Sequence, residues 1–261
     1  MVAHVHDTPG PWTIGVSVAV LVLAVAYLRA WAWRRSALAN PIPAWRAASF
    51  FAGLASALVA VASPIGRGDE RLLTFHMVQH LLLMTVAPPL IFLGEPVSTL
   101  WHHPVTRPRR PRAPVSLAVC WIPATATLIG WHIPAAFTVA LRSPTWHAVE
   151  QASFLVAGLL FWWPVVQPWP SPREPRWSTV LYLFLATLPC DILSGFLVFS
   201  DRVAYSVYLS TSSGLTALDD QQCAGAVMWT CVTVVYLVAG MIVSTQLLVS
   251  PTLHERLAEI A

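Results

Sequence analysis

The sequence is poor in charged residues, and this property most restricts what the protein can be. Only 10% of its 261 residues are charged, whereas a soluble domain carries about 25%. Hydrophobic residues make up 56% of the chain, and the mean hydropathy is +0.64. So few charges cannot cover a water-facing surface. The composition therefore excludes a soluble domain and indicates an integral membrane protein.

Several motifs are also missing. Lysine is absent, and the 15 arginines lie in short segments between apolar runs, so nothing supports a nucleic-acid partner. Cysteine is scarce and no pair has the C-x-x-C spacing, so we expect free thiols in helices at Cys120, Cys190, Cys223 and Cys231. The sequence contains no glycine-rich phosphate loop, nucleophile elbow or kinase pattern. We therefore predict that the protein is not an enzyme.

What the sequence has in abundance is long apolar runs. A run of about 20 apolar residues can cross a bilayer as a helix. Seven such runs occur, at Trp12–Trp33, Trp45–Ser63, Leu72–Leu93, Val115–Trp131, Trp146–Gln167, Trp177–Phe199 and Ala224–Val249. Tryptophans stand near many of their ends, as in the aromatic belts of membrane proteins. We predict an all-α, polytopic membrane bundle of seven transmembrane helices that forms a single domain over residues 1–261.

The arginines predict how this bundle is oriented. With the N-terminus outside, 11 arginines fall in the cytoplasmic loops and tail, and the outer loops hold only four: Arg67, Arg71, Arg142 and Arg202. Cytoplasmic loops of membrane proteins carry an excess of positive charge. The distribution therefore predicts an N-terminus outside and a C-terminus in the cytoplasm.

The third run, within the stretch from Phe75 to Pro96, carries ionisable groups. His76 and His80 are four residues apart, so they lie on one face of a helix. Ionisable groups inside a membrane span are costly and mark functional sites by default. Pro88 and Pro89 are expected to kink the same helix. This face is where we expect the function to be.

Other spans contribute further polar groups at the same membrane depth, in the outer half of the bundle. Imidazole, carboxylate and thioether are metal ligands, and imidazole together with thioether suits copper. Glu150 or Asp191 could instead bond a liganding histidine and fix its tautomer. The sequence thus predicts a metal site, with copper as the suspected ion, drawn from five spans: His76, His80, His132, His147, Glu150, Asp191, Asp220 and Met228.

The same residues also have purely structural interpretations. The histidines could lie at the membrane interface and bond loop carbonyls, and the methionines could pack against neighbours or lipid. Asp191 follows Pro189 and could cap a broken helix or bond Ser194. Asp219 and Asp220 could cap the N-terminus of the last span.

Three blocks of the sequence form a distinctive series. They are HMVQHLLLM (76–84) with APPL (87–90) and GEP (94–96), HAVEQASF (147–154) with GLLFWWPV (158–165), and DQQ (220–222) with AG (224–225) and MW (228–229). In content and order these blocks, which span most of the chain, resemble the CtaG-type cytochrome c oxidase assembly proteins.

The resemblance implies a seven-span, multi-pass protein of the bacterial inner membrane that helps to assemble haem–copper cytochrome c oxidase. It further implies a task in copper handling, and we expect the outward-facing cluster of histidines and carboxylates to bind or deliver the ion. The expected partners are oxidase subunits, membrane lipid and a periplasmic copper donor.

Two other functions stay open from the residues alone. A haem-binding protein or haem carrier could use histidines of facing helices as axial ligands, although the histidines crowd one half of the bundle. An intramembrane metallohydrolase could use Glu150 as its base. The HMVQH motif departs from the zinc-protease pattern, because Met77 stands where that pattern has glutamate.

Overall fold

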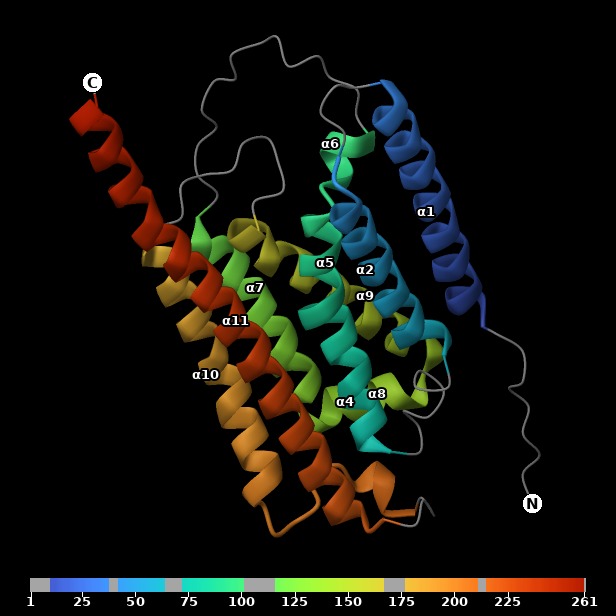
Figure 1. Cartoon of the computed structure of the whole chain (residues 1–261). Helices are drawn as coiled ribbons and strands as arrows, with labels where there is room; N and C mark the ends of the chain where they lie inside the picture. The colour runs from blue at the N-terminus through green and yellow to red at the C-terminus, as the bar shows by residue number, and fades with distance from the viewer. Residues whose placement is uncertain are drawn as a thin grey trace.

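The structure is a computed structural model that describes residues 10–37, 42–63, 72–100, 116–166, 177–210 and 215–260 (Figure 1). Within these ranges all regular structure is helical and there is no strand. The all-α class is therefore confirmed.

The elements follow one another without a second kind of layer. In chain order they are α1 (Pro11–Ala37), α2 (Ala44–Ala62), α4 (Leu73–Leu81), the π-helical turn η1 (Leu82–Val86), α5 (Ala87–Leu93), α6 (Pro96–Leu100), α7 (Leu117–His132), α8 (Pro134–Arg142), α9 (Pro144–Val166), α10 (Trp177–Phe199), the 3₁₀ turn η2 (Ser206–Ser210) and α11 (Ala217–Ile260).

The predicted number of membrane spans agrees with this order of elements. Six helical stretches in the described ranges are long and apolar enough to cross a membrane, and the bent pair α7–α8 raises the number to seven. The protein is therefore a multi-pass helical membrane protein. The side of the membrane on which each terminus lies remains a prediction.

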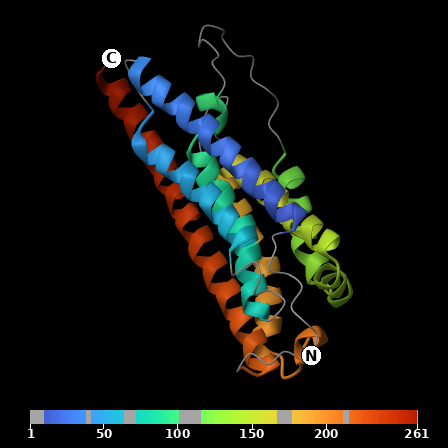
Figure 2. The same cartoon turned by 90° about the vertical axis from the view of Figure 1, so that its right-hand side faces the viewer.

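The third span is the centre of the bundle. The stretch Leu73–Leu93 packs against α2, α9 and α11, and 56% of its most apolar window is buried, compared with 6% for α1. Figure 2 shows α1 at the periphery, in front of α2. The helix that carries His76 and His80 therefore has protein rather than lipid on most sides.

The fourth span differs from its predicted bounds of Val115–Trp131. Helix α7 covers 16 residues, ends at His132, and meets α8 at an angle of 76°. Ile133 is extended (φ −66°, ψ 126°) because it precedes Pro134, and a proline disfavours helical geometry in the residue before it. The bend places His132 at a corner, with α8 folded across the end of the bundle.

Helix α11 begins at Ala217, seven residues before the apolar run that starts at Ala224. Thr216 is the reason. Its hydroxyl accepts a hydrogen bond from the Asp219 amide (3.1 Å) and donates one to the Asp219 carboxylate (2.6 Å). These two hydrogen bonds cap the N-terminus of α11, so the helix includes the polar residues that come before the apolar run.

The proline pair in the third span produces a π turn. Pro88 has no N–H, so the carbonyl of Met84, four residues earlier, loses its helical donor. The Ala87 amide bonds a carbonyl five residues back, and the indole of Trp162 donates to the Met84 carbonyl (3.2 Å). A Cβ on Gly158 would lie 2.6 Å from that carbonyl oxygen, so the contact between α9 and η1 requires glycine there.

We predict that Gly158→Ala lowers the free energy of unfolding by about 2 kcal/mol, because the added methyl group meets backbone atoms that cannot move aside. Gly240→Ala is the matched control, since a Cβ there has nothing within 4 Å. Thermal unfolding in detergent measures both variants. Equal unfolding temperatures for the two variants would contradict the close contact.

Candidate metal centre

The site is built around a carboxylate that is withdrawn from water. Glu150 on α9 is 0% exposed, and it faces His76 and His80 on α4, which are 0% and 5% exposed. Its Oε1 atom lies 3.4 Å from the Nε2 atom of His76 and 3.4 Å from that of His80. One oxygen therefore lies between two imidazoles from successive turns of the same helix.

These three side chains lack the hydrogen bonds that buried polar groups usually make. Among the described residues, no hydrogen-bond partner is found for either ring nitrogen of His76 or His80, or for either oxygen of Glu150. A buried polar atom without a partner costs about 1–3 kcal/mol. The Nε2 atoms of His76 and His80 face the Glu150 carboxylate, and this arrangement fits a bound cation, which would accept lone pairs from these groups.

His147 completes the cluster from α9, one turn before Glu150. Its Nε2 atom is 4.0 Å from Glu150 Oε2, and its side chain is 20% exposed. His76, His147 and Glu150 each offer a ligand atom within 4.8 Å of the others. Because metal–nitrogen and metal–oxygen bonds are about 2.0–2.2 Å long, small rotations could bring all three onto one ion. We call His76, His80, His147 and Glu150 the imidazole cluster.

Two glutamines position His147, and the sequence analysis missed both as site residues. Gln79 donates to the Ala60 carbonyl (2.9 Å), which leaves its Oε1 atom 3.1 Å from His147 Nε2. Gln151 accepts from Trp12 (2.7 Å), which turns its amide nitrogen toward the same ring atom, also at 3.1 Å. The Gln79 oxygen needs a hydrogen on the His147 Nε2 atom, whereas the Gln151 amide nitrogen needs a lone pair there. A neutral ring therefore satisfies only one of the two glutamines. The sequence did contain a signal for both glutamines, because Gln79 directly precedes His80 and Gln151 directly follows Glu150.

Aromatic side chains close the end of the cluster. The Phe137 ring on α8 lies 4.7 Å from the His76 ring, and the Tyr205 ring packs on Phe137 at 4.2 Å. The Tyr205 hydroxyl donates to the His132 carbonyl (3.0 Å). Burial, and secondarily the charge of Glu150, raises the pKa of Tyr205, so this phenol remains a donor. The bend at Ile133 therefore helps to exclude water from the cluster.

His132 lies beside the imidazole cluster but has its own partners. Its ring centre is 6.1 Å from that of His80. The Nδ1 atom lies 2.7 Å from the Leu128 carbonyl, and the Nε2 atom lies 3.3 Å from the sulfur of Met77. His132 therefore joins a neighbouring site and does not contact Glu150 directly.

Asp220 holds a helix in place. Its Oδ2 atom accepts from the Leu73 amide (2.6 Å), and its Oδ1 atom accepts from the Thr74 amide (3.1 Å) and hydroxyl (2.7 Å). The aspartate thus caps the N-terminus of α4 rather than of its own helix, and it stabilises the helix that carries His76. The structure does not bring its carboxylate into the cluster.

The two remaining predicted residues lie apart from Glu150. Met228 is 3% exposed and faces a small cavity that it shares with His80 and His132. Asp191 on α10 is half-buried, and no partner is found for its Oδ1 atom among the described residues. The eight predicted residues therefore fall into four groups. Four form the imidazole cluster, His132 and Met228 line the small cavity beside it, Asp220 caps α4, and Asp191 lies separately.

Comparison with known proteins gives one family over most of the chain. The model of a family described as cytochrome c oxidase caa3 assembly factor matches residues 25–250. The uncharacterized proteins Mb0105 of Mycobacterium bovis and MT0111 of Mycobacterium tuberculosis are each 26% identical over 237 residues, and the uncharacterized protein ML1998 of Mycobacterium leprae is 22% identical over 240.

These alignments cover 82% of this chain and 35–36% of each relative, so the chain spans about a third of the length of the curated relatives it matches. No solved structure matches significantly.

We predict that Asp220→Ala lowers the free energy of unfolding by about 2 kcal/mol, because it leaves the first amides of α4 without acceptors. Hydrogen exchange at Leu73 and Thr74, together with thermal unfolding, measures the loss. Asp219→Ala is the control, since Asp219 is an exposed residue that bonds Thr216 alone in the described structure. A smaller loss for Asp220→Ala than for Asp219→Ala would contradict the long-range cap.

Proposed function

This chain belongs to the cytochrome c oxidase caa3 assembly factor family, and we propose that it serves oxidase assembly by binding copper as cargo at the imidazole cluster. The family indicates a role in building the oxidase and suggests a non-catalytic one. The binding of copper is the further step that we add from the donor atoms.

The observation that carries the proposal is the convergence of side chains from α4 and α9, of which His76, His80 and Glu150 have no hydrogen-bond partner among the described residues. Three imidazoles and one carboxylate face one another, and no arginine among the described residues forms an ion pair with Glu150. Imidazole suits copper as well as zinc, iron and nickel. The role of the family in oxidase assembly favours copper among these ions.

The exposure of the four side chains suggests how an ion could enter. The side chains of His76 and Glu150 are 0% exposed and that of His80 is 6% exposed, whereas that of His147 is 20% exposed. His147 is therefore the open edge of the cluster. Because Gln79 and Gln151 compete with a metal for its Nε2 atom, binding there would be weakened, which suits a carrier that must release its ion.

The location of the cluster also fits delivery from outside the cell. The imidazole cluster lies toward the end of the bundle where α4 and α9 begin, which Figure 1 shows opposite the end of α11. The arginine distribution predicts that this end faces outward. We propose that the protein resides in the bacterial inner membrane, receives copper from a periplasmic donor and passes it to an oxidase subunit.

The two alternatives find less support in the geometry. A haem carrier would need a ring nitrogen directed into a large cavity. His132 borders a cleft of about 970 Å³, but its two nitrogens face Leu128 and Met77 instead. A hydrolase would need water at Glu150, which is 0% exposed. A Soret band in the purified protein would favour haem instead.

We predict that His76→Ala/His80→Ala lowers the copper-to-protein ratio after loading with Cu(I) under reducing conditions, because two of the four ligands are lost. Elemental analysis of the purified protein measures the ratio. Asp219→Asn, which removes an exposed carboxylate at the same end of the bundle, is expected to bind like the wild type. An unchanged ratio in a double variant that unfolds at the normal temperature would refute the proposal.

A further inference from the structure

We infer that the protein has a second metal site, formed by Met77 and His132 and selective for Cu(I), beside the imidazole cluster. The two residues come from α4 and α7, and they are 0% and 5% exposed. The sulfur of Met77 lies 3.3 Å from the Nε2 atom of His132. The site itself stands on these contacts, and it does not depend on metal binding at the imidazole cluster.

The hydrogen bond on the other side of the imidazole ring fixes what faces Met77. The Leu128 carbonyl is only an acceptor, and it lies 2.7 Å from Nδ1 of His132, so Nδ1 carries the hydrogen. In the neutral ring, Nε2 then presents a lone pair. The thioether of Met77 also presents lone pairs. Two hydrogen-bond acceptors thus face each other in a buried place. The Nε2 atom could donate to the sulfur only if the ring also carried a second proton, which would bury a positive charge at a high cost in free energy.

The separation of these two atoms suits a shared ion. With metal–nitrogen and metal–sulfur bonds of about 2.0 and 2.3 Å, the lengths found for zinc, a separation of 3.3 Å corresponds to an N–metal–S angle of about 100°. That angle is close to the tetrahedral value. An ion could therefore bind with little movement of either side chain.

The surroundings select a soft, singly charged ion. A cavity of about 40 Å³ adjoins the pair, somewhat larger than the volume of about 30 Å³ that a water molecule occupies in the liquid. Among the described residues, no carboxylate lines it. Its sulfur and imidazole side chains are soft or borderline ligands, namely Met77, His80, Met84, His132, Cys190 and Met228, and its oxygen-bearing side chains are the uncharged Thr85, Thr125 and Tyr236. Thioether and thiol groups select Cu(I), whereas carboxylates would have favoured harder ions.

His80 connects the two sites, and this connection rests on the proposed function. Its Nε2 atom lies 3.4 Å from Glu150, and the residue also lines the small cavity beside Met77. A copper ion could pass from the imidazole cluster to this site by exchanging ligands at His80. The ion remains Cu(I), so the transfer needs no electron donor.

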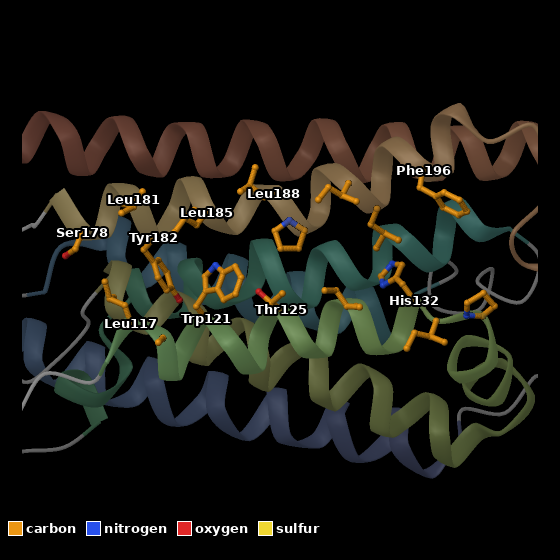
Figure 3. Close-up of a pocket in the computed structure, with 17 residues that line it drawn as sticks. Leu117, Trp121, Thr125, His132, Ser178, Leu181, Tyr182, Leu185, Leu188 and Phe196 are labelled. Carbon is orange, nitrogen blue, oxygen red and sulfur yellow. The ribbon is translucent and has the colours of Figure 1, made fainter.

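A larger cleft shares two lining residues with the small cavity of the second site. His132 and Thr125 line the small cavity and also border a cleft of about 970 Å³ between α7 and α10. Figure 3 shows the labelled side chains of α7 and α10 along this cleft, with His132 near one end and Thr125 closer to its middle. The second site therefore lies between the imidazole cluster and a membrane-facing cleft.

X-ray absorption at the copper edge of the full-length protein loaded with Cu(I) tests the site. We expect a Cu–S shell in the wild type that is lost in Met77→Leu, a change that conserves volume but removes the sulfur. Met241→Leu is the control, because Met241 is 52% exposed on α11. In competition with a Cu(I) chelator, Met77→Leu should weaken binding by at least about tenfold, since losing even an outer partner of a ligand costs about that much.

Each outcome decides one of the two sites. A Cu–S shell that survives in Met77→Leu, or that is absent from the wild type, would overturn the second site even if His76→Ala/His80→Ala lowers the copper content. A Cu–S shell that persists in His76→Ala/His147→Ala and disappears in Met77→Leu would establish the second site. Metal binding at the imidazole cluster is then judged separately by its own copper ratio.

Discussion

The rest of the structure depends on one constraint, the need to compensate a carboxylate held out of water inside a membrane bundle. Glu150 is 0% exposed, and its nearest charged or chargeable neighbours are histidines. An isolated carboxylate in such surroundings would cost many kcal/mol, so it must be neutralised or paired. The arrangement of α4 against α9 places imidazoles within reach of both its oxygens. A bound cation would complete that compensation.

The close packing of α4, η1 and α9 depends on residues outside the imidazole cluster. Pro88 removes a helical donor and Trp162 replaces it, so the backbone of the third span is tied to α9. Gly158 lets the two backbones approach, and Asp220 holds the first turn of α4 from α11. These contacts fix the heights at which His76, His80 and Glu150 meet. These three side chains are therefore positioned by the fold rather than by a flexible loop.

Local spacing made the imidazole cluster predictable, whereas long-range contacts did not show in the sequence. The four-residue spacing of His76 and His80 and the three-residue spacing of His147 and Glu150 put each pair on one helix face. Asp220 was predicted as a ligand or a cap of its own helix, but its partner Leu73 is 147 residues away. The role of Met77 depends on the bend after α7, which periodicity does not reveal.

The two donor sets differ in a way that suits a copper ion moving from water toward lipid. The imidazole cluster contains a carboxylate and has a partly exposed edge at His147, so it can receive an ion that still has solvent nearby. The pair of Met77 and His132 offers neutral, softer donors in a buried place. The desolvation free energy of burying an ion grows with the square of its charge. For a monovalent ion it is therefore about a quarter of the value for a divalent ion of the same size. We therefore expect the proposed second site, whose donors are softer and uncharged, to favour Cu(I) both by ligand preference and by desolvation.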